Sequence, residues 1–385
     1  MVPKLRFRKF TNEWCESLLG NIVDIKSGNS PSTYDLSSEG DYPFVKVEDM
    51  NNCIKYQIDA REYVINSNFC FPIGSVIFPK RGAAIMNNKV RILNQNSCAD
   101  TNMMALIAKH INPEFLYYLI NLIGLYKIAD TSTIPQINNK HISPFKVNIP
   151  SEEEQTKIAN FLASVDEKIT LLNKHYDLLC QYKKGMMQKL FSQELRFKDE
   201  NGEGFPEWDY DEVSALVSNK SKKYNPVSGI NYPCIELDCI SQESGQLLTT
   251  VDSLQQQSIK NIFGEGDVLF GKLRPYLRKY ILATFDGVCS SEIWVLKGIL
   301  MHNAYLYQFV QTDFFINLAN KSTGSKMPRA DWDTISSTFV FYPCLEEQKK
   351  IADFLSAIDN KITTQKAELD KLKVWKHGLL QQMFV

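Results

Sequence analysis

The sequence has no surplus of either charge. Its 385 residues carry 43 Lys and Arg against 44 Asp and Glu. This balance excludes a strongly basic protein that coats nucleic acid through bulk charge, and it excludes an acidic disordered tail. Long hydrophobic runs are also lacking, because the most apolar stretch, 115–129, is short and carries Asn121 and Lys127. No apolar segment follows the basic N-terminus, so we predict no secretory signal and no membrane association, and expect a cytoplasmic protein.

Metal-binding patterns are missing as well. The nine cysteines include no Cys-x-x-Cys pair and none lies near a histidine at zinc-ligand spacing. The five histidines form no H-E-x-x-H cluster, so we predict no metal site. An odd, scattered set of cysteines is typical of a reducing compartment, and we expect these side chains to be buried thiols.

Catalytic motifs are not found either. Asn225-Pro226 lacks the aromatic partner of an adenine-methylase Asn-Pro-Pro-Tyr motif, and Gly20 and Gly28 form no phosphate- or cofactor-binding loop. The chain is nevertheless 44% apolar with 22 Phe and 17 Tyr, which argues against disorder, and its length suits two or three domains. We therefore predict a folded, non-catalytic chain that binds no cofactor of its own.

The chain repeats itself over nearly its whole length. Leu5-Arg6-Phe7 recurs as Leu195-Arg196-Phe197, a shift of 190, and the segment 74–80 recurs as 266–272. From Pro135 and Pro328 onward the shift is 193, and 19 of 43 positions are identical between 150–192 and 343–385. Because a solenoid needs a period of about 20–50 residues, this pattern indicates the duplication of one large unit.

The second part of each unit is predicted to be a long helix. Pro150 and Pro343 open segments with the acids that favour a helix start. Apolar residues then recur with the 3.5-residue period of a coiled coil. Lys183 and Lys376 interrupt this seam at matched places, and Gln365 stands where the first copy has Leu172; such polar breaks can fix register. The predicted seam comprises Ile158, Leu162, Val165, Ile169, Leu172 and Leu179 in the first copy and Ile351, Leu355, Ile358, Ile362, Leu369 and Leu372 in the second.

Each helix of about 40 residues would be about 60 Å long, more than the diameter of a small domain. We expect the two helices to pair with each other in antiparallel fashion. The alternative is that each helix packs on its own globular domain.

The first part of each unit is predicted to be an α/β domain of mixed α+β type. Runs such as 74–79 and 266–271 are strand-like, 113–129 and 303–319 are helical in pattern, and the polar, Gly-rich stretch 194–207 is typical of a linker. Charge is uneven: by count, 1–150 has a net charge of +3 and 193–342 of −5. The predicted domains are 1–149 and 193–342, and the predicted helices are 150–192 and 343–385.

Basic residues that could meet phosphate or base edges are local. In both copies they follow a strand-like run and fall in a predicted loop, where a solvated surface is the alternative interpretation. Asn87 and Asn88 could read adenine, but a turn is equally compatible with them. The candidate DNA-binding residues are Lys80, Arg81, Asn87, Asn88 and Lys89 in the first copy and Lys272, Arg274, Arg278 and Lys279 in the second.

These features resemble the specificity (S) subunits of type I restriction–modification systems. The most family-like strings are IPSEEEQTKIANFLASVDEKI and YPCLEEQKKIADFLSAIDNKI, each placed after an α/β unit. Just upstream, the strings STIPQI from Ser132 and SKMPRA from Ser325 resemble a short loop of that family. One departure is Glu152, an extra acid where the second copy has Cys344-Leu345.

The resemblance implies two target recognition domains joined by two long antiparallel helices, with pseudo-two-fold symmetry. It implies a chain without catalytic activity that reads a bipartite, asymmetric target on double-stranded DNA. It also implies binding to two methyltransferase (M) subunits, and to restriction (R) subunits in the full complex. S-adenosylmethionine would then belong to the methyltransferase partner, and ATP and Mg to the restriction partner. A coiled-coil scaffold that tethers partner subunits without touching DNA is the competing hypothesis.

Overall fold

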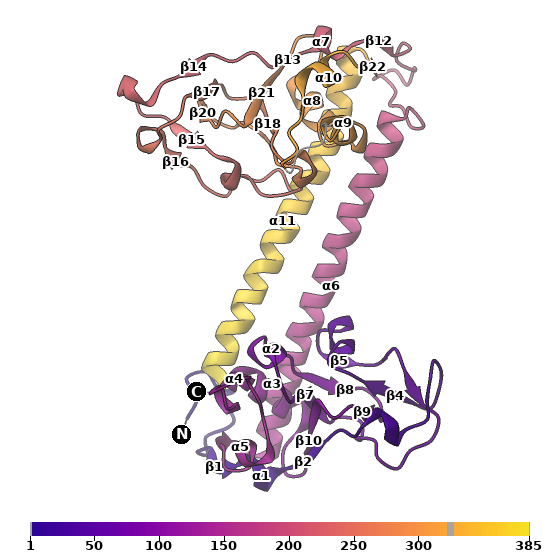
Figure 1. The fold of residues 1–385 in the computed structure, drawn as a ribbon, viewed down its shortest axis with the longest axis vertical. Helices are drawn as coiled ribbons and strands as arrows, with labels where there is room; N and C mark the ends of the chain where they lie inside the picture. Colours follow the sequence, from indigo (N-terminus) through magenta and orange to yellow (C-terminus); the bar gives the residue numbers. More distant parts are fainter. Residues whose placement is uncertain (1, 322–326, 385) are drawn as a thin grey trace. The chain divides into compact units, whose positions relative to one another are not determined.

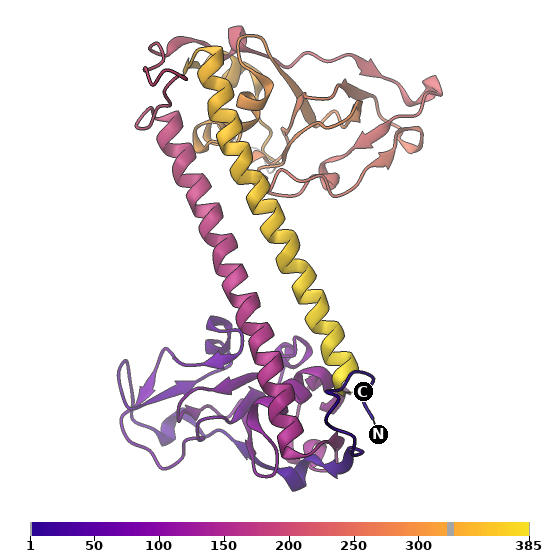
Figure 2. The ribbon, with the colours of Figure 1, turned by 180° about the vertical axis from the view of Figure 1, so that it is seen from behind.

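The chain folds into two compact units that each combine a globular domain with parts of both long helices. In the computed structural model, which describes residues 2–321 and 327–384, unit 1 comprises Met1–Asn173 with Ala367–Val385, and unit 2 comprises Lys174–Lys366. The long helices are α6 (Glu152–Phe191) and α11 (Leu345–Phe384), which run side by side (Figures 1 and 2). Both helices therefore contribute to both units.

Unit 1 is built on two mixed sheets and one small antiparallel sheet. The small sheet pairs β1 with β11, immediately before α6, and the larger sheets have the strand orders β2-β10-β7-β8-β5 and β3-β6-β4-β9. The strands are β1 (Cys15–Leu18), β2 (Val23–Ser27), β3 (Leu36–Ser37), β4 (Tyr42–Val45), β5 (Tyr56–Gln57), β6 (Tyr63–Val64), β7 (Val76–Pro79), β8 (Arg91–Leu93), β9 (Cys98–Ala99), β10 (Met103–Ala108) and β11 (Lys146–Ile149). The short helices are α1 (Leu19–Ile22), α2 (Ala83–Met86), α3 (Pro113–Ile123), α4 (Leu125–Ile128) and α5 (Asn139–Ile142).

Unit 2 repeats this plan, except that its four-stranded sheet is antiparallel throughout and only its five-stranded sheet is mixed. Its small sheet pairs β12 with β22, immediately before α11, and its larger sheets have the orders β13-β21-β18-β19 and β14-β17-β20-β15-β16. The strands are β12 (Asp209–Glu212), β13 (Val217–Ser218), β14 (Lys223–Tyr224), β15 (Pro233–Ile235), β16 (Val251–Asp252), β17 (Lys260–Phe263), β18 (Val268–Gly271), β19 (Tyr280–Leu282), β20 (Gly287–Cys289), β21 (Ile293–Gly298) and β22 (Phe339–Tyr342). The short helices are α7 (Val213–Leu216), α8 (Asn303–Phe309), α9 (Asp313–Ala319) and α10 (Trp332–Ser336).

The prediction of two α/β domains with long paired helices is confirmed. Equivalent glycines, Gly74 and Gly266, turn the chain into strands β7 and β18 with φ values of +84° and +83°, which side chains rarely adopt. The predicted helix 113–129 is broken at Gly124, where φ is +83°, so α3 and α4 are separate. Its counterpart 303–319 is likewise divided, into α8 and α9.

Each unit has a core in which the long helices are packed both on each other and on the domain. In unit 1, Ile158 and Leu162 of α6 share a cluster with Leu379 and Met383 of α11, so the helices run antiparallel there. Phe115 of α3 lies in the same cluster. Unit 2 repeats this arrangement. The two packing modes that the sequence presents as alternatives therefore occur together.

The expectation that all cysteines are thiols is wrong for one pair. Cys70 and Cys98 form a disulfide in unit 1. They are 28 residues apart in sequence, and Cys98 lies on the short strand β9, so no local spacing motif brings them together. Of the other cysteines, Cys234, Cys239 and Cys289 are buried thiols, whereas Cys15 is an exposed one.

Within the described ranges, no helix is long and apolar enough to cross a membrane. The same residues contain no group of three or more His, Cys, Asp or Glu side chains that could hold a metal ion.

Candidate nucleic-acid interface and helix joints

A basic loop and a proline loop are joined in each unit. In unit 1, Gly82 N donates to Pro135 O (2.9 Å) and Ile137 N donates to Lys80 O (2.9 Å). These two loops are about 50 residues apart in the sequence, yet they form one surface. The basic loop follows β7, the middle strand of the sheet β2-β10-β7-β8-β5, so this sheet positions the loop.

Unit 2 builds the same surface with a different sequence. Arg274 N donates to Pro328 O (2.8 Å) and Ala330 N donates to Lys272 O (2.8 Å). The beginning of the predicted SKMPRA loop, Ser325 and Lys326, lies outside the described residues. Because the hydrogen bonds use backbone atoms only, the side chains of each loop can differ without changing how the loop is held.

Five of the nine candidate DNA-binding side chains are available to solvent. Arg81, Asn87 and Arg274 are exposed, and Lys80 and Lys272 are half-buried. Lys80 Nζ makes one long contact with Ser27 Oγ, at 3.5 Å. The other four make no side-chain hydrogen bond or ion pair to any described residue, so their polar groups are free to bind a ligand.

Contacts within the fold occupy the other two candidates of unit 1. The Asn88 side chain donates to Asn121 O (3.0 Å) and accepts from Leu125 N (2.9 Å). Lys89 Nζ donates to Asn51 Oδ1 at 2.5 Å. These contacts hold the segment after α2 against its neighbours.

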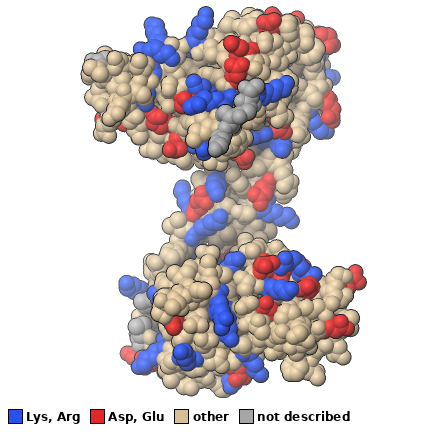
Figure 3. Space-filling model, in the orientation of Figure 1, with Lys and Arg blue, Asp and Glu red and all other residues tan. Residues whose placement is uncertain are grey.

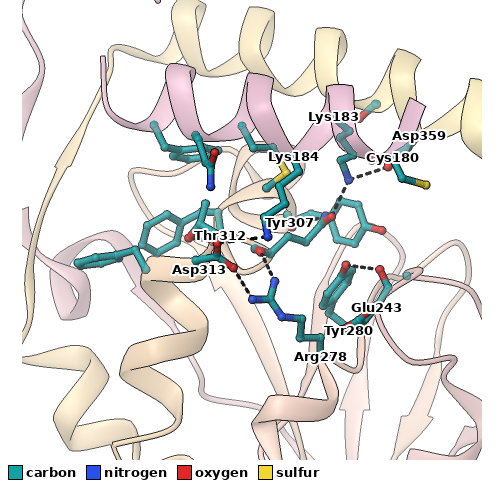
Figure 4. A pocket seen from close by; sticks show the side chains of 18 of the residues that line it. Cys180, Lys183, Lys184, Glu243, Arg278, Tyr280, Tyr307, Thr312, Asp313 and Asp359 are labelled. Atoms are coloured by element: carbon teal, nitrogen blue, oxygen red, sulfur yellow. Dashed lines mark hydrogen bonds and ion pairs between the residues drawn. The ribbon is translucent and has the colours of Figure 1, made fainter. Parts of the chain in front are cut away.

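The remaining two candidates of unit 2 are also engaged. Arg278 forms an ion pair with Asp313, and its hydrogen bond holds the pKa of that carboxyl below the usual value. Lys279 Nζ donates to Leu237 O at 2.7 Å. Figure 4 shows Arg278 directed toward Asp313.

Charge on the surface is mixed. Figure 3 shows Lys and Arg side chains interspersed with Asp and Glu over the drawn face of each unit. Since no single-sign field covers either face, an interaction with phosphate would depend on local groups such as these loops.

The repeated Glu-Glu-Gln string joins each helix to its domain. Glu154, with 1% of its side chain exposed, accepts two hydrogen bonds of 2.7 Å from Arg6. In unit 2, Glu347 accepts bonds of 3.2 and 2.8 Å from Arg196, and another of 3.1 Å from Trp208 Nε1. A buried carboxylate requires such a partner, because an unpaired buried charge is very costly.

The glutamine of the string caps a helix of the domain. Gln155 Oε1 accepts from Asn112 N (2.7 Å), and Asn112 is the N-cap of α3. Gln348 Oε1 accepts from His302 N (2.7 Å), and His302 is the N-cap of α8. The motif is therefore a structural joint, which explains why a duplicated chain has it twice.

An ion pair joins the two long helices in each unit. Lys183 Nζ of α6 lies 2.6 Å from Asp359 Oδ1 of α11 (Figure 4). In unit 1, Lys376 Nζ of α11 lies 2.5 Å from Asp166 Oδ1 of α6. These are the lysines that interrupt the predicted seam, and residues 193 positions apart form both pairs.

The same aspartates also meet the domains. Tyr118 OH of α3 donates to Asp166 Oδ2 (2.6 Å), and Gln308 Nε2 of α8 donates to Asp359 Oδ2 (3.1 Å). Burial, followed by the charge of Asp166, raises the pKa of Tyr118 far above its usual value, so this hydroxyl stays protonated and donates. Each aspartate thus connects two helices and a domain.

None of the predicted seam residues is fully exposed. Seven of them are buried: Ile158, Leu162, Val165, Ile351, Leu355, Ile358 and Leu369. Five are half-buried: Ile169, Leu172, Leu179, Ile362 and Leu372.

Sequence reasoning missed the polar partners of this seam. Four charged residues form the ion pairs that hold the long helices: Arg6, Arg196, Asp166 and Asp359. The periodicity of apolar residues cannot predict them, because it concerns only the apolar positions. The signal was present in the repeat, since all four are identical between the two copies.

Comparison with known proteins places this architecture in a class. The family model for the type I restriction modification DNA specificity domain matches residues 11–180 and again 211–374. The MjaVIII specificity subunit of Methanocaldococcus jannaschii is 23% identical over 96% of this chain and 91% of its own length. The EcoDI specificity subunit of Escherichia coli is 24% identical over 89% of this chain and 80% of its own.

Solved structures show the same fold. The S subunit of a type I restriction–modification system from M. genitalium covers 100% of this chain and 99% of its own, with a TM-score of 0.61 and 17% identity. A chain from a structure concerned with complex assembly and conformational transition of the type I R-M system covers 97% of this chain and 98% of its own, with a TM-score of 0.54 and 14% identity.

The two family matches cover most of the chain, which therefore belongs to the type I restriction modification DNA specificity family. It is a specificity (S) subunit, a non-catalytic component of such a system.

Proposed function

We propose that this subunit reads a bipartite DNA target with one unit on each half-site, and that it holds two methyltransferase subunits over that target. The observation that carries the proposal is the repeated loop pair. Each unit presents a basic loop tied to a proline loop, with Arg81 exposed in one and Arg274 in the other. Arginine is suited to phosphate and to the guanine edge in the major groove.

The two half-sites should differ in sequence. The loop with Lys80, Arg81 and Asn87 in unit 1 corresponds to the loop with Lys272 and Arg274 in unit 2. Different side chains therefore stand on loops that equivalent backbone hydrogen bonds hold. A duplicated reader suits the two-fold symmetry of duplex DNA, and dissimilar copies make the target asymmetric.

Domains, partners and cofactors follow the family plan. Recognition domains would span 1–149 and 193–342, and spacer helices 150–192 and 343–385. S-adenosylmethionine would be bound by the methyltransferase subunits, and ATP and Mg by restriction subunits of the full complex. This chain would supply DNA recognition and the docking surfaces for its partners.

Helix length should set the spacer between the half-sites. Removing seven residues from α6 (170–176) and the equivalent seven from α11 (363–369) shortens each helix by about 10 Å at 1.5 Å per residue. At about 3.4 Å per base pair, the spacer should shorten by about three base pairs, with both half-sites unchanged. Methylated sites in cells that express the variant with its methyltransferase subunit would be sequenced.

A matched control keeps the length. Thr170→Ala and Thr363→Ala alter exposed positions of the same segments and should leave spacer and half-sites as they are. An unchanged spacer in the shortened variant would contradict the proposal that the helices set this distance.

The salt dependence of DNA binding distinguishes the proposed function from the competing scaffold hypothesis. If the loops contact phosphate, replacing Lys80, Arg81, Lys272 and Arg274 by alanine should weaken DNA binding by the assembled complex. Each lost contact should also lower the slope of log affinity against log salt by about 1. An unchanged affinity and slope would favour a scaffold that does not touch DNA through these loops.

A further inference from the structure

The two small sheets, β1 with β11 and β12 with β22, pair their strands in the same register. The side chains on their outer faces differ in chemical character. In unit 2, β12 and β22 pair so that Tyr210 is opposite Phe341 and Glu212 is opposite Phe339. Because side chains alternate across a strand, these four share one face, while Val340 on the other face is buried. Tyr210, Phe339 and Phe341 are 58%, 47% and 55% exposed.

These three rings form one cluster, which we name the aromatic face. The Tyr210 ring centroid lies 4.6 Å from that of Phe341 and 5.2 Å from that of Phe339. The contacts between the rings orient them, but about half of the surface of each residue stays exposed to solvent. Burial of such area would be strongly favourable on binding, since aromatic side chains dominate the energetics of interfaces.

Unit 1 shows that the fold does not need this cluster. In the equivalent pair of strands, β1 and β11, Glu16 is opposite Asn148 and Leu18 is opposite Lys146. Lys146 Nζ donates to Glu16 Oε1 (2.8 Å), with both side chains more than half exposed. A solvated ion pair, with Leu18 (37% exposed) beside it, therefore occupies the place of the aromatic face.

The contrast continues into the long helices. Leu345, the first residue of α11, is 45% exposed, and its equivalent at the start of α6 is Glu152. Four matched positions are thus large and mainly apolar in unit 2 and polar or charged in unit 1, while one position is reversed, with Leu18 (37% exposed) in unit 1 and Glu212 in unit 2. The balance of exposed apolar surface therefore lies with unit 2, which indicates a contact that unit 2 makes more strongly.

The aromatic face also borders a hollow of about 1760 Å³ inside unit 2. Tyr210, Phe339 and Phe341 line it together with Phe314, which is 49% exposed. Figure 4 shows side chains that line this hollow, among them Lys183 and Arg278, which are held in ion pairs. The hollow gives a partner segment room beside the exposed rings.

Charge around the aromatic face selects the kind of partner. Glu212 shares the aromatic face, Asp209 and Asp211 lie on the opposite side of the same strand, and Glu207, just before β12, is almost fully exposed at 3.8 Å from Arg196. Burial raises the pKa of Tyr342, and the charges of Asp209 and Asp211 raise it further. This acidic strand would repel duplex phosphates, and a second copy would meet it with the same charges.

We propose that the aromatic face is a docking site for a methyltransferase subunit, through a segment with an apolar anchor flanked by Lys or Arg. The inference rests on the proposed function and deepens it, because it makes the two docking positions unequal. The methyltransferase subunit at unit 2 has three exposed rings to bind, whereas the one at unit 1 has an ion pair and a single exposed leucine, Leu18. The first methyltransferase subunit to bind therefore occupies unit 2.

The test exchanges the two faces in the full-length chain. In the first variant Tyr210→Glu, Phe339→Lys and Phe341→Asn place the unit 1 residues in unit 2. In the reciprocal variant Glu16→Tyr, Lys146→Phe and Asn148→Phe do the reverse. Native mass spectrometry during titration with the cognate methyltransferase subunit gives both stepwise affinities. The pair Glu16→Ala with Lys146→Ala serves as a control that breaks only the exposed ion pair.

The first variant should weaken the first binding step by at least about tenfold, as expected on removing buried aromatic anchors. The reciprocal variant should tighten the second step, and the control should change neither. Circular dichroism checks folding, and Phe341→Asn alone provides a milder version that should weaken the first step in the same direction.

Other outcomes overturn the inference. Unchanged stepwise affinities in the first variant would do so, as would a wild-type chain that dimerises through this face in sedimentation experiments. Loss of restriction-subunit or DNA binding with methyltransferase binding intact would assign the face to another partner. If the methyltransferase subunit does not bind the wild-type chain at all, the docking function itself fails along with the inference.

Discussion

The ion pair between Lys183 and Asp359 offers a measurable test of how the long helices are held in register. The perturbation is a double-mutant cycle of Lys183→Met, Asp359→Asn and the double variant. The two charged atoms are 2.6 Å apart, and their side chains are 12% and 29% exposed. At an effective dielectric constant of about 20, the Coulomb energy of such a pair is about 6 kcal/mol.

Desolvation and screening reduce this figure substantially. A buried pair loses about 3–5 kcal/mol when one partner is removed, whereas exposed pairs couple by less than about 1 kcal/mol. The Lys183–Asp359 pair lies between these limits, and Gln311 and Gln308 remain to solvate the partner left behind. We therefore expect Lys183→Met to destabilise unit 2 by about 2 kcal/mol, with a coupling energy of about 1–2 kcal/mol.

Hydrogen-exchange mass spectrometry under native conditions measures this effect in each unit separately. Peptides from 174–191 should lose protection in Lys183→Met, while peptides from 152–165 should not. Lys376→Met, which breaks the matched ion pair with Asp166 in unit 1, should have the reverse effect: peptides from 152–165 should lose protection and peptides from 174–191 should not. A coupling energy below about 0.3 kcal/mol in both units would refute the idea that these pairs stabilise the helix register.

Three further predictions concern unit 2. In filter-binding assays, Arg274→Ala should lower the slope of log affinity for DNA against log salt by about 1. The guanidinium of Arg278 is held by Asp313, so Arg278→Ala should leave this slope unchanged and should instead lower the stability of unit 2. Because Arg278 lowers the pKa of Asp313, this pair stabilises unit 2 above the usual carboxyl pKa; that contribution is lost as the pH falls through the lowered pKa, so Asp313→Asn should weaken the pH dependence of unfolding on the acid side. Arg196→Ala should destabilise unit 2 by about 3–5 kcal/mol in urea unfolding, because it leaves Glu347 buried without its charge partner; a loss below about 1 kcal/mol would contradict a structural role for this joint.

The candidate interface shows how far local sequence information extends. The positions of the basic loops follow from strand-like runs and their neighbouring glycines, which are local features. Arg274 and Arg278 are only four residues apart and look alike in sequence, yet one is exposed and the other is held by Asp313 on α9. That difference depends on a residue 35 positions away, so no local pattern could separate them.

Patterns along the chain predict its plan: a duplicated α/β unit, each copy followed by an apolar heptad repeat that begins at an acidic string. Such features are read from neighbours along the chain, since helix and strand periods are local properties of the backbone. The tertiary structure alone decided which polar groups meet, including the carboxylates that Arg6 and Arg196 pair with and the bond between Cys70 and Cys98. It also decided that β12 and β22 expose an aromatic face where β1 and β11 expose an ion pair. These outcomes depend on contacts between segments far apart in sequence, which form only when the whole unit has folded.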